Sequence, residues 1–182
     1  MASNPAPGDL EHVRAFVNTW DEDDRTEELS DGAALAGWLR EHGLADGRVE
    51  ARPKDLEHAV ALREALRAIL LHHGGEELDP AAPEVVEEAA RRARLEVRFD
   101  GHGHAGVEPL AGGVDGALGR LLALVAEAQR SGEWERLKVC PAHDCHWAFY
   151  DRSRNRSAVW CDMRVCGNRA KVRSFRERSQ AT

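Results

Sequence analysis

The stretches CPAHDC (residues 140–145) and CDMRVC (residues 161–166) contain every cysteine of this 182-residue chain. Their spacing, C-x4-C-x15-C-x4-C, is typical of a four-thiolate zinc site in which each close pair forms a knuckle. Two disulfides or inert buried cysteines are the alternatives, but this spacing in an intracellular protein favours a metal. We therefore predict one structural Zn²⁺ with the following ligands: Cys140, Cys145, Cys161 and Cys166.

The residues around the cysteines fit knuckle turns. Pro141 fixes one backbone angle, and Gly167 permits a left-handed backbone. His143 and His146 could substitute as ligands, but four cysteines already complete the coordination shell. Tyr150 is expected to be less constrained than the other aromatic residues. Those others should form the small core of the finger, with base stacking as the alternative, and they are Trp147, Phe149 and Trp160.

Longer stretches carry a family resemblance. Those near the cysteines are Cys140-Pro141, Trp147-Ala148-Phe149, Asp151-Arg152-Ser153-Arg154-Asn155, Trp160-Cys161 and Cys166-Gly167-Asn168-Arg169-Ala170-Lys171, and together they resemble a CGNR zinc finger. Three N-terminal stretches are similar to the ABATE domain, which precedes this finger in a bacterial family of stress-responsive transcription regulators: FVNT (16–19), LAGWL (35–39) and LREAL (62–66). The resemblance covers nearly the whole chain and implies a zinc-binding regulator of transcription.

The pattern of apolar residues predicts an α+β protein with two parts. A mostly helical domain with a small β-hairpin is expected over residues 9–135, followed by a four-cysteine finger with a basic terminal helix over residues 136–182. We expect helices at 9–20, 31–41, 54–73, 83–94, 118–129 and 168–179, strands at 95–99 and 107–110, and a solvated acidic loop at 21–30. A tail of roughly 40 residues cannot bury a core by itself, so zinc should stabilise it, and we expect it to pack on the helical domain.

The net charge of −7 is divided unevenly along the chain. From Cys140 onward there are nine Lys and Arg against four Asp and Glu, a balance of +5, while the preceding residues balance at −12. A binding partner responds to local charge, because charges beyond a Debye length of roughly 8 Å are screened. The basic tail therefore favours contact with nucleic acid, and docking of the tail on the acidic domain is the alternative.

Two sets of basic residues are candidate phosphate contacts. In an extended segment, alternation would place Arg152, Arg154 and Arg156 on one side. In the last helix, the i, i+4, i+7 spacing places a second set on one face, with Lys171 flanking it. The alternative for this helix is a solvated surface, which would normally mix charges, whereas only Glu177 is acidic there. The second set is Arg169, Arg173 and Arg176.

These patterns predict a DNA-binding transcription regulator whose partner is double-stranded DNA. Its helical domain would sense a small-molecule effector, form a homodimer, or both. The alternatives are a protein-interaction or ligand-binding module in which zinc is purely structural, and a redox switch that releases the metal. We do not expect an enzyme, because a catalytic zinc keeps one position open and no catalytic motif is found. Without a signal peptide or a membrane-spanning stretch, we expect a cytoplasmic protein.

Overall fold

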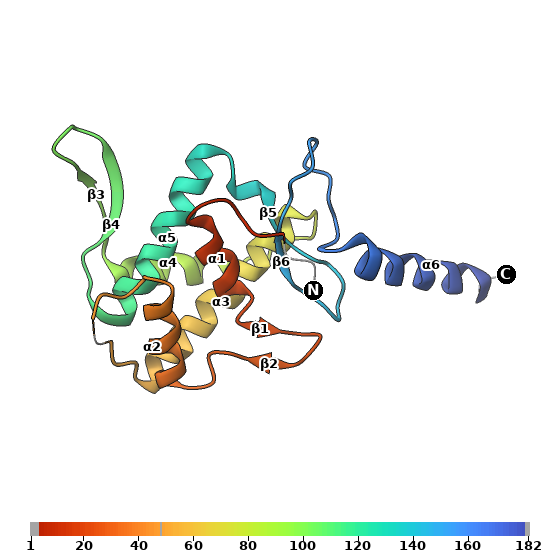
Figure 1. The fold of residues 1–182 in the computed structure, drawn as a ribbon, viewed down its shortest axis with the longest axis horizontal. Coiled ribbons are helices and arrows are strands. Elements are labelled where there is room, and N and C mark those ends of the chain that lie inside the picture. Colours follow the sequence, from red (N-terminus) through yellow and green to blue (C-terminus); the bar gives the residue numbers. More distant parts are fainter. Residues whose placement is uncertain (1–3, 48, 181–182) are drawn as a thin grey trace.

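The computed structural model describes residues 4–47 and 49–180, without the side chains of residues 174, 177 and 180. Its architecture is the predicted α+β fold, with a mostly helical body from which one hairpin and the last helix project at opposite ends (Figure 1). The helices of the described residues are α1 (Leu10–Val17), α2 (Gly32–Glu41), α3 (Pro53–His73), α4 (Ala82–Ala93), α5 (Gly113–Ser131), the 3-10 helix η1 (Trp134–Arg136), the π-helix η2 (Met163–Gly167) and α6 (Asn168–Gln180).

The helix ends follow local chemistry. The Asp31 carboxylate accepts the N–H of Ala34 at 2.8 Å, which starts α2. Pro53 is the first residue of α3, where its missing N–H costs nothing. α5 begins at Gly113, five positions before the predicted start at Leu118. Its first turns contain several glycines, which hid the buried face that begins there.

Three antiparallel pairs of strands lie in the described part of the chain: β1 (Trp20–Asp21) with β2 (Thr26–Glu27), β3 (Leu95–Phe99) with β4 (Ala105–Pro109), and β5 (Leu137–Val139) with β6 (Ala148–Tyr150). The hairpin β3–β4 confirms the predicted strand at 95–99. The other two pairs were not predicted, because strands of two or three residues are too short to show an alternating pattern.

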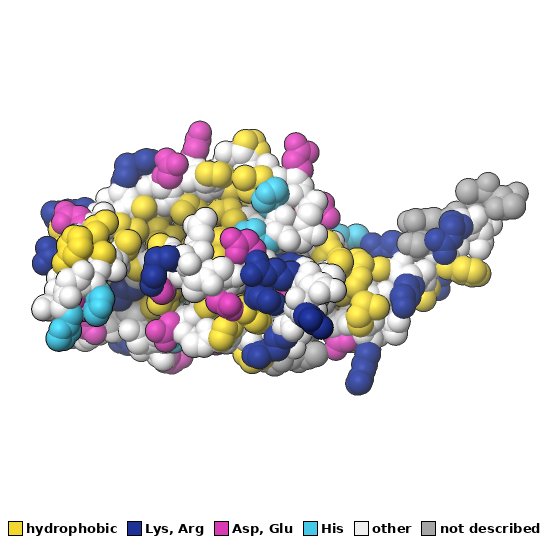
Figure 2. Space-filling model, turned by 90° about the horizontal axis from the view of Figure 1, so that it is seen from above, with side chains coloured by type: hydrophobic (Ala, Val, Ile, Leu, Met, Phe, Trp, Pro, Cys, Tyr) yellow, Lys and Arg dark blue, Asp and Glu magenta, His cyan; other side chains and the backbone are white. Residues whose placement is uncertain are grey.

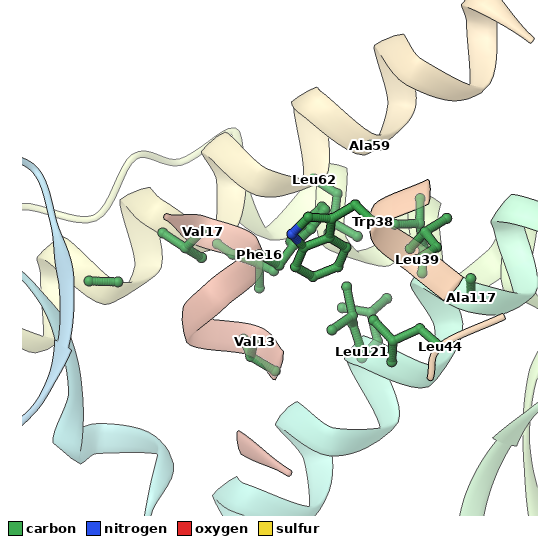
Figure 3. Packing of buried hydrophobic residues seen from close by; sticks show 14 of the residues in the cluster. Val13, Phe16, Val17, Trp38, Leu39, Leu44, Ala59, Leu62, Ala117 and Leu121 are labelled. Carbon is green, nitrogen blue, oxygen red and sulfur yellow. The ribbon is translucent and has the colours of Figure 1, made fainter. Parts of the chain in front are cut away.

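One hydrophobic core holds the helical body together (Figure 3). α1, α2, α3 and α5 each contribute side chains that are almost fully buried, among them Val13, Phe16, Leu35, Leu39, Leu62, Leu66 and Leu121. Burying a side chain of this size stabilises the fold by about 1.5–3 kcal/mol each before entropy is counted. The body is therefore stabilised by many independent contacts.

The acidic segment after α1 is not the solvated loop that was predicted. Leu29, near its end, is only 2% exposed and belongs to the core. Glu27 accepts two hydrogen bonds from Arg63 of α3, at 2.7 and 2.8 Å. Glu27 thus fixes the segment to α3 and Leu29 fixes it to the core, while the turn between β1 and β2 stays exposed.

The finger packs on the helical domain through β5 and β6. Leu137, Val139 and Tyr150 belong to the core of the body, whereas Phe149 packs in a second cluster with the cysteines. Tyr150 was expected to be less constrained, and this was wrong: its side chain is 7% exposed and its hydroxyl donates to Glu133. Neighbouring residues of a strand point to opposite faces, so one short hairpin can join two cores.

Among the described residues, no helix is both long and apolar enough to cross a membrane.

Candidate metal centre and nucleic-acid interface

The four cysteines converge at one point. Their sulfur atoms all lie within 4.8 Å of one another, and all four residues are buried. The Sγ atoms of Cys145 and Cys161 are 3.5 Å apart, and those of Cys161 and Cys166 are 3.7 Å apart. A tetrahedron of thiolates at about 2.3 Å from zinc has edges of roughly 3.8 Å. The sulfur spacing therefore fits one four-coordinate Zn²⁺, and the predicted set of cysteines is complete.

Four thiols this close cannot all ionise without a cation. Hydrogen bonds from Cys145 and Cys161 lower the pKa of Cys140 to about 2, with further donation from the Ala142 N–H. The hydrogen bond with Cys140 raises the pKa of Cys145 to about 12 and also raises that of Cys161. Burial raises the pKa of Cys166. Without a cation, the pKa values of three of the four thiols are thus raised, and Zn²⁺ supplies the charge that lets them lose their protons.

Backbone geometry around the cysteines differs from the prediction at Gly167. The left-handed residue of the finger's first knuckle is His146, at φ 46°, while Gly167 lies outside the left-handed region. Gly167 is instead closely packed: a Cβ there would lie 2.6 Å from the Met163 sulfur, at the end of a flexible side chain, and 3.3 Å from Trp160. The neighbouring Trp160 and Trp147 pack against the cysteine cluster, as expected for the core of the finger.

The two histidines near the first pair remain outside the cluster of possible metal ligands. The imidazole of His143 is 72% exposed and lies 3.7 Å from Asp144. His146 contributes its backbone carbonyl, which accepts a hydrogen bond of 2.7 Å from Arg67. Neither residue therefore competes with the four thiolates.

A buried ion pair holds the loop between the two knuckles. The ammonium of Lys138 lies 2.8 Å from the Asp151 carboxylate, and the two side chains are 7% and 0% exposed. Lys138 also donates to the carbonyls of Arg156 and Ala158, at 2.6 and 3.2 Å. Burial opposes ionisation of Asp151, but the bonds from Lys138 and from the N–H groups of Ser153 and Ala158 prevail and lower its pKa. Every charge of this pair is thus satisfied locally.

Asn18, in the FVNT stretch, joins α1 to the finger. Its amide nitrogen donates to the carbonyl of Ala148 at 2.9 Å, and its amide oxygen accepts the N–H of the same residue at 2.7 Å. The side chain thus takes the place of a neighbouring strand on the edge of β6. This contact gives the FVNT stretch a structural role at the junction of the two parts.

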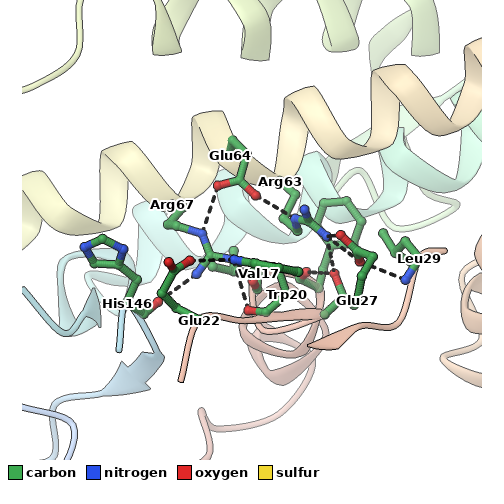
Figure 4. A network of polar contacts seen from close by, with 11 residues as sticks. Val17, Trp20, Glu22, Glu27, Leu29, Arg63, Glu64, Arg67 and His146 are labelled. Atoms are coloured by element: carbon green, nitrogen blue, oxygen red, sulfur yellow. Dashed lines mark hydrogen bonds and ion pairs between the residues drawn. The ribbon is translucent and has the colours of Figure 1, made fainter. Parts of the chain in front are cut away.

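Arg67 of α3 makes the second link between the two parts (Figure 4). Its guanidinium donates to the carbonyls of Val17 and His146 at 2.6 and 2.7 Å and lies 3.0 Å from Glu64. Burial lowers the pKa of Arg67, although an arginine stays charged at any physiological pH. One buried cation thereby connects the end of α1, the middle of α3 and the residue that follows Cys145.

The segment with the first basic set is a turn and not an extended strand. The N–H of Arg156 bonds to the Ser153 carbonyl at 3.3 Å, and Arg156 has a φ of 53°. The prediction that Arg152, Arg154 and Arg156 project to one side was therefore wrong. The turn forms because the buried Lys138 draws the Arg156 carbonyl inward, a long-range contact that no local pattern reveals.

These three arginines have different surroundings. Arg152 donates to the carbonyl of Pro5 at 2.9 Å, and Arg156 lies 3.9 Å from the carboxylate of Glu135. Arg154 is exposed and has no ion-pair partner among the described residues. Two of the three side chains are therefore partly engaged within the chain.

The second basic set borders a groove of about 660 Å³ along α6. α6 packs against η2 and otherwise projects from the body, and Lys and Arg side chains gather along it (Figure 2). Arg169, Arg173 and Arg176 share this face as predicted, while Lys171 is not part of it. The lining residues are Asp144, Arg164, Val165, Asn168, Arg169, Val172, Arg173 and Arg176.

Besides the Arg156–Glu135 contact, the basic tail docks on the acidic domain at the base of α6. The guanidinium of Arg169 lies 3.5 Å from Asp23 in the β1–β2 turn and 3.4 Å from Asp144 in the first knuckle. These carboxylates raise the pKa of Arg169. The side chains of Arg173 and Arg176 have no ion-pair partner among the described residues and remain exposed.

The geometry defines a class of protein: a helical domain joined to a four-cysteine structural zinc finger. Residues 136–179 match the family model of the CGNR zinc finger, and residues 12–129 match that of the ABATE family, described as “Putative stress-induced transcription regulator”. The second match spans more than half of the chain, so the protein belongs to the ABATE family. Neither family is one of enzymes. A search of curated proteins finds no match to the chain.

Sequence reasoning missed several residues of the site. Arg164 borders the α6 groove. The sequence could have indicated this, because Arg164 lies between the metal ligands Cys161 and Cys166. Lys138 and Asp151 had no such signal, because their pairing depends on the fold of the intervening chain. The roles of Asn18 and Arg67 were equally hidden, since each contacts a carbonyl far away in the sequence.

Proposed function

We propose that this protein is a zinc-dependent, DNA-binding transcription regulator that contacts double-stranded DNA through the groove along α6. The proposal assigns residues 9–135 to the regulatory domain and residues 136–182 to the DNA-contacting finger. One observation carries it: the side chains of Arg164, Arg173 and Arg176 border one groove and have no ion-pair partner among the described residues. Guanidinium groups without carboxylate partners are suited to phosphate contacts.

The shape of the projecting helix supports this assignment. A helix of 13 residues is roughly 20 Å long, and the major groove of B-DNA accepts an α-helix. The zinc cluster fixes the start of α6, because η2 contains Cys166 and runs directly into the helix. The exposed Val172 lies in the same groove and could contact a thymine methyl group.

The remaining basic residues have secondary roles in this proposal. Arg154 and Lys171 are exposed and would contact flanking phosphates. Arg152 and Arg156 are partly engaged by Pro5 and Glu135, so their contribution should be smaller. Arg169 is already paired with two carboxylates, and it would position the base of α6 more than it would attract DNA.

A salt series on duplex DNA tests the proposal. If three to five arginines and lysines reach phosphates, the logarithm of the affinity should fall with the logarithm of salt concentration at a slope of roughly −3 to −5. The triple variant Arg164→Gln/Arg173→Gln/Arg176→Gln should reduce this slope by about 3. The control Arg91→Gln/Arg94→Gln/Arg130→Gln makes the same change in net charge on the helical domain.

Two results would overturn this function. One is no binding by the zinc-loaded protein at about 50 mM salt, where phosphate contacts are strongest. The other is equal loss of affinity in the α6 variant and in the control, which would mean that net charge alone governs binding.

A protein-interaction module is the second candidate, and the exposed apolar residues of the finger favour it. Phe175 and Met163 are 65% and 51% exposed, and neither lines the arginine groove. Phe175→Ser should leave DNA affinity unchanged under the first proposal. If the variant loses a protein partner while the arginine variant keeps it, the finger is a protein-binding surface.

The helical domain would provide regulation. A cavity of about 450 Å³ lies among α3, α4 and α5, with His58, Val85 and Leu118 in its wall. Its size is within the range of small-molecule sites, which leaves room for an effector.

A further inference from the structure

The hairpin β3–β4 lies at the end of the molecule opposite to α6 (Figure 1), and it exposes apolar side chains to solvent. Val97 and Phe99 of β3 are 64% and 71% exposed. Leu95 and Pro109, at the base of the hairpin, lie close to Gly119 of α5. The apolar face therefore starts on the body and continues onto strands that project into solvent.

The outer edge of β3 carries backbone groups without partners. The N–H of Leu110 bonds to the Arg94 carbonyl, and the N–H of Asp100 bonds to the His104 carbonyl. Because bonding alternates along an antiparallel strand, the even-numbered residues of β3 face β4. Leu95, Val97 and Phe99 consequently direct their N–H and carbonyl groups away from β4, and no described residue bonds to them there.

The charges on the polar face of the hairpin are not matched within the chain. Glu96 stands opposite Glu108 on β4, and Arg98 stands opposite Gly106. None of these charged side chains has an ion-pair partner among the described residues. Like charges directly opposite each other on a sheet are destabilising, so the hairpin lacks a cation beside Glu96 and an anion beside Arg98.

We propose that two copies of this chain pair through β3 about a two-fold axis at Val97, forming a continuous antiparallel sheet. In this register, Glu96 of each copy lies opposite Arg98 of the other copy, on the polar face. Leu95 lies opposite Phe99, and Val97 lies opposite itself, on the apolar face. The outward N–H groups of the three apolar residues then meet carbonyls of the second copy.

A second copy fits this edge because β3 is complementary to itself. An isologous interface uses the same surface twice. When a second copy runs antiparallel, the sequence Glu96-Val97-Arg98 places each glutamate opposite an arginine and each arginine opposite a glutamate. Pairing through β4 lacks this property, since Gly106 would stand opposite Glu108 and Pro109 has no N–H to donate. Of the two strands of the hairpin, only β3 is therefore complementary to a second copy of itself.

This dimer goes beyond the proposed function and does not depend on it. In each copy the hairpin and α6 lie at opposite ends (Figure 1), so the dimer would carry its two fingers at its outer ends. Oligomeric state and DNA affinity are separate measurements, and either proposal can fail while the other holds.

Charge exchange on β3 tests the register. Sedimentation of the full zinc-loaded chain up to about 100 μM should show a monomer–dimer equilibrium. Arg98→Glu replaces two attractive pairs by two repulsive ones and should weaken dimerisation roughly tenfold or more. Glu96→Arg/Arg98→Glu exchanges both charges and should restore the dimer. These side chains are exposed, so circular dichroism should show unchanged folding.

Cross-linking tests the position of the axis. Opposed Cα atoms in a hydrogen-bonded pair are about 5.5 Å apart, which a disulfide can span. Val97→Cys should therefore form a covalent dimer on mild oxidation of the zinc-loaded protein. Val107→Cys, on the same face but on β4, is the matched control and should remain monomeric under denaturing electrophoresis.

A chain that stays monomeric at about 100 μM overturns the inference. So does a dimer whose affinity is unchanged by Arg98→Glu, or one that is not restored by the double exchange. Equal cross-linking at residues 97 and 107 would place the contact elsewhere on the hairpin and contradict the proposed axis.

Discussion

The helical domain buries aliphatic and aromatic side chains from α1, α2, α3 and α5, whereas only Ala142 and Phe149 among the apolar residues packed around the finger's cysteines are buried. In the first region many contacts share the stabilisation, so that no single contact is indispensable. In the second, one ion replaces the missing hydrophobic core. The two regions meet at β5–β6, where one face of a short hairpin belongs to each. They should therefore respond very differently to the same perturbation.

Removal of zinc should have the largest effect, and it should be confined to the finger. Zinc binding contributes folding free energy on the order of 10 kcal/mol to a site of this kind. We predict that chelation removes hydrogen-exchange protection from residues 140–147 and 151–180 and leaves α1, α3 and α5 protected. β5 should stay protected too, because Leu137 and Val139 belong to the core of the body.

Substitution of one zinc ligand, with a control at a neighbouring residue, tests the same prediction without a chelator. Cys161→Ser should reproduce the effect of chelation, whereas Met163→Ser, at an exposed sulfur in the same knuckle, should retain the metal. Equal loss of protection in the helical domain after chelation would contradict the division into two separately stabilised regions.

The contrast also shows what the sequence could predict. The cysteine spacing identified a complete ligand set, because a four-thiolate site needs only local knuckles that converge. The alternation at residues 95–99 and the apolar period of α3 were equally visible, since both patterns are local. Regular periodicity and metal-ligand spacing were therefore reliable guides to the fold.

Long-range contacts account for what the sequence did not show. The turn at residues 153–156 exists because Lys138 draws in two distant carbonyls, and Tyr150 is buried because β6 lies on the helical body. Gly167 is not left-handed as predicted, and its close neighbours are instead Met163 and Trp160, which no local backbone pattern reveals. In each case the residue that determines the local conformation or burial lies in another part of the fold or on an adjacent turn.

Loss of the buried cation should have the second-largest effect. Lys138→Met leaves the Asp151 carboxylate buried and unpaired, which should cost about 3–5 kcal/mol of unfolding free energy. Adding Asp151→Asn removes the uncompensated charge and should recover part of the loss. The control Arg130→Met breaks an exposed pair and should cost less than about 1 kcal/mol.

Denaturant unfolding, followed by tryptophan fluorescence, measures these differences. If Lys138→Met and Arg130→Met cost the same, then the ion pair under the loop contributes no more than a surface pair, and the loop must be held by other contacts.

Loss of the Asn18 contact, which links the helical domain to the finger, should have the third-largest effect. Asn18→Ala leaves the N–H of Ala148 without its partner and the carbonyl with only a long bond of 3.4 Å from Arg14, which should cost about 1–3 kcal/mol. Hydrogen exchange at Ala148 should accelerate more than exchange within α3, because the lost bonds are local to β6. Asn155→Ala, at an exposed position of the finger loop, is the control, and equal effects of the two variants would contradict the role of Asn18.

The smallest effect concerns a carboxylate at the start of α3, within the helical domain. The hydrogen bond from the Arg52 side chain lowers the pKa of Asp55, which also accepts the Arg52 N–H at 2.8 Å. A lowered pKa in the folded state means that the ionised group stabilises the fold above its unfolded pKa of about 3.9. This contribution is lost as pH falls through the lower pKa of the folded state.

Asp55→Asn should therefore lower the unfolding free energy at pH 7 by at most about 1 kcal/mol, because its partner Arg52 is 80% exposed. The difference between variant and wild type should shrink toward zero as the pH falls through the folded pKa of Asp55. Protonation of the thiolates also releases zinc in acid, but that loss is common to both proteins and cancels in the difference. A difference in unfolding free energy between variant and wild type that persists in acid would mean that Asp55 stabilises the fold through packing. The helical domain would then be stabilised at this position by steric fit and not by charge.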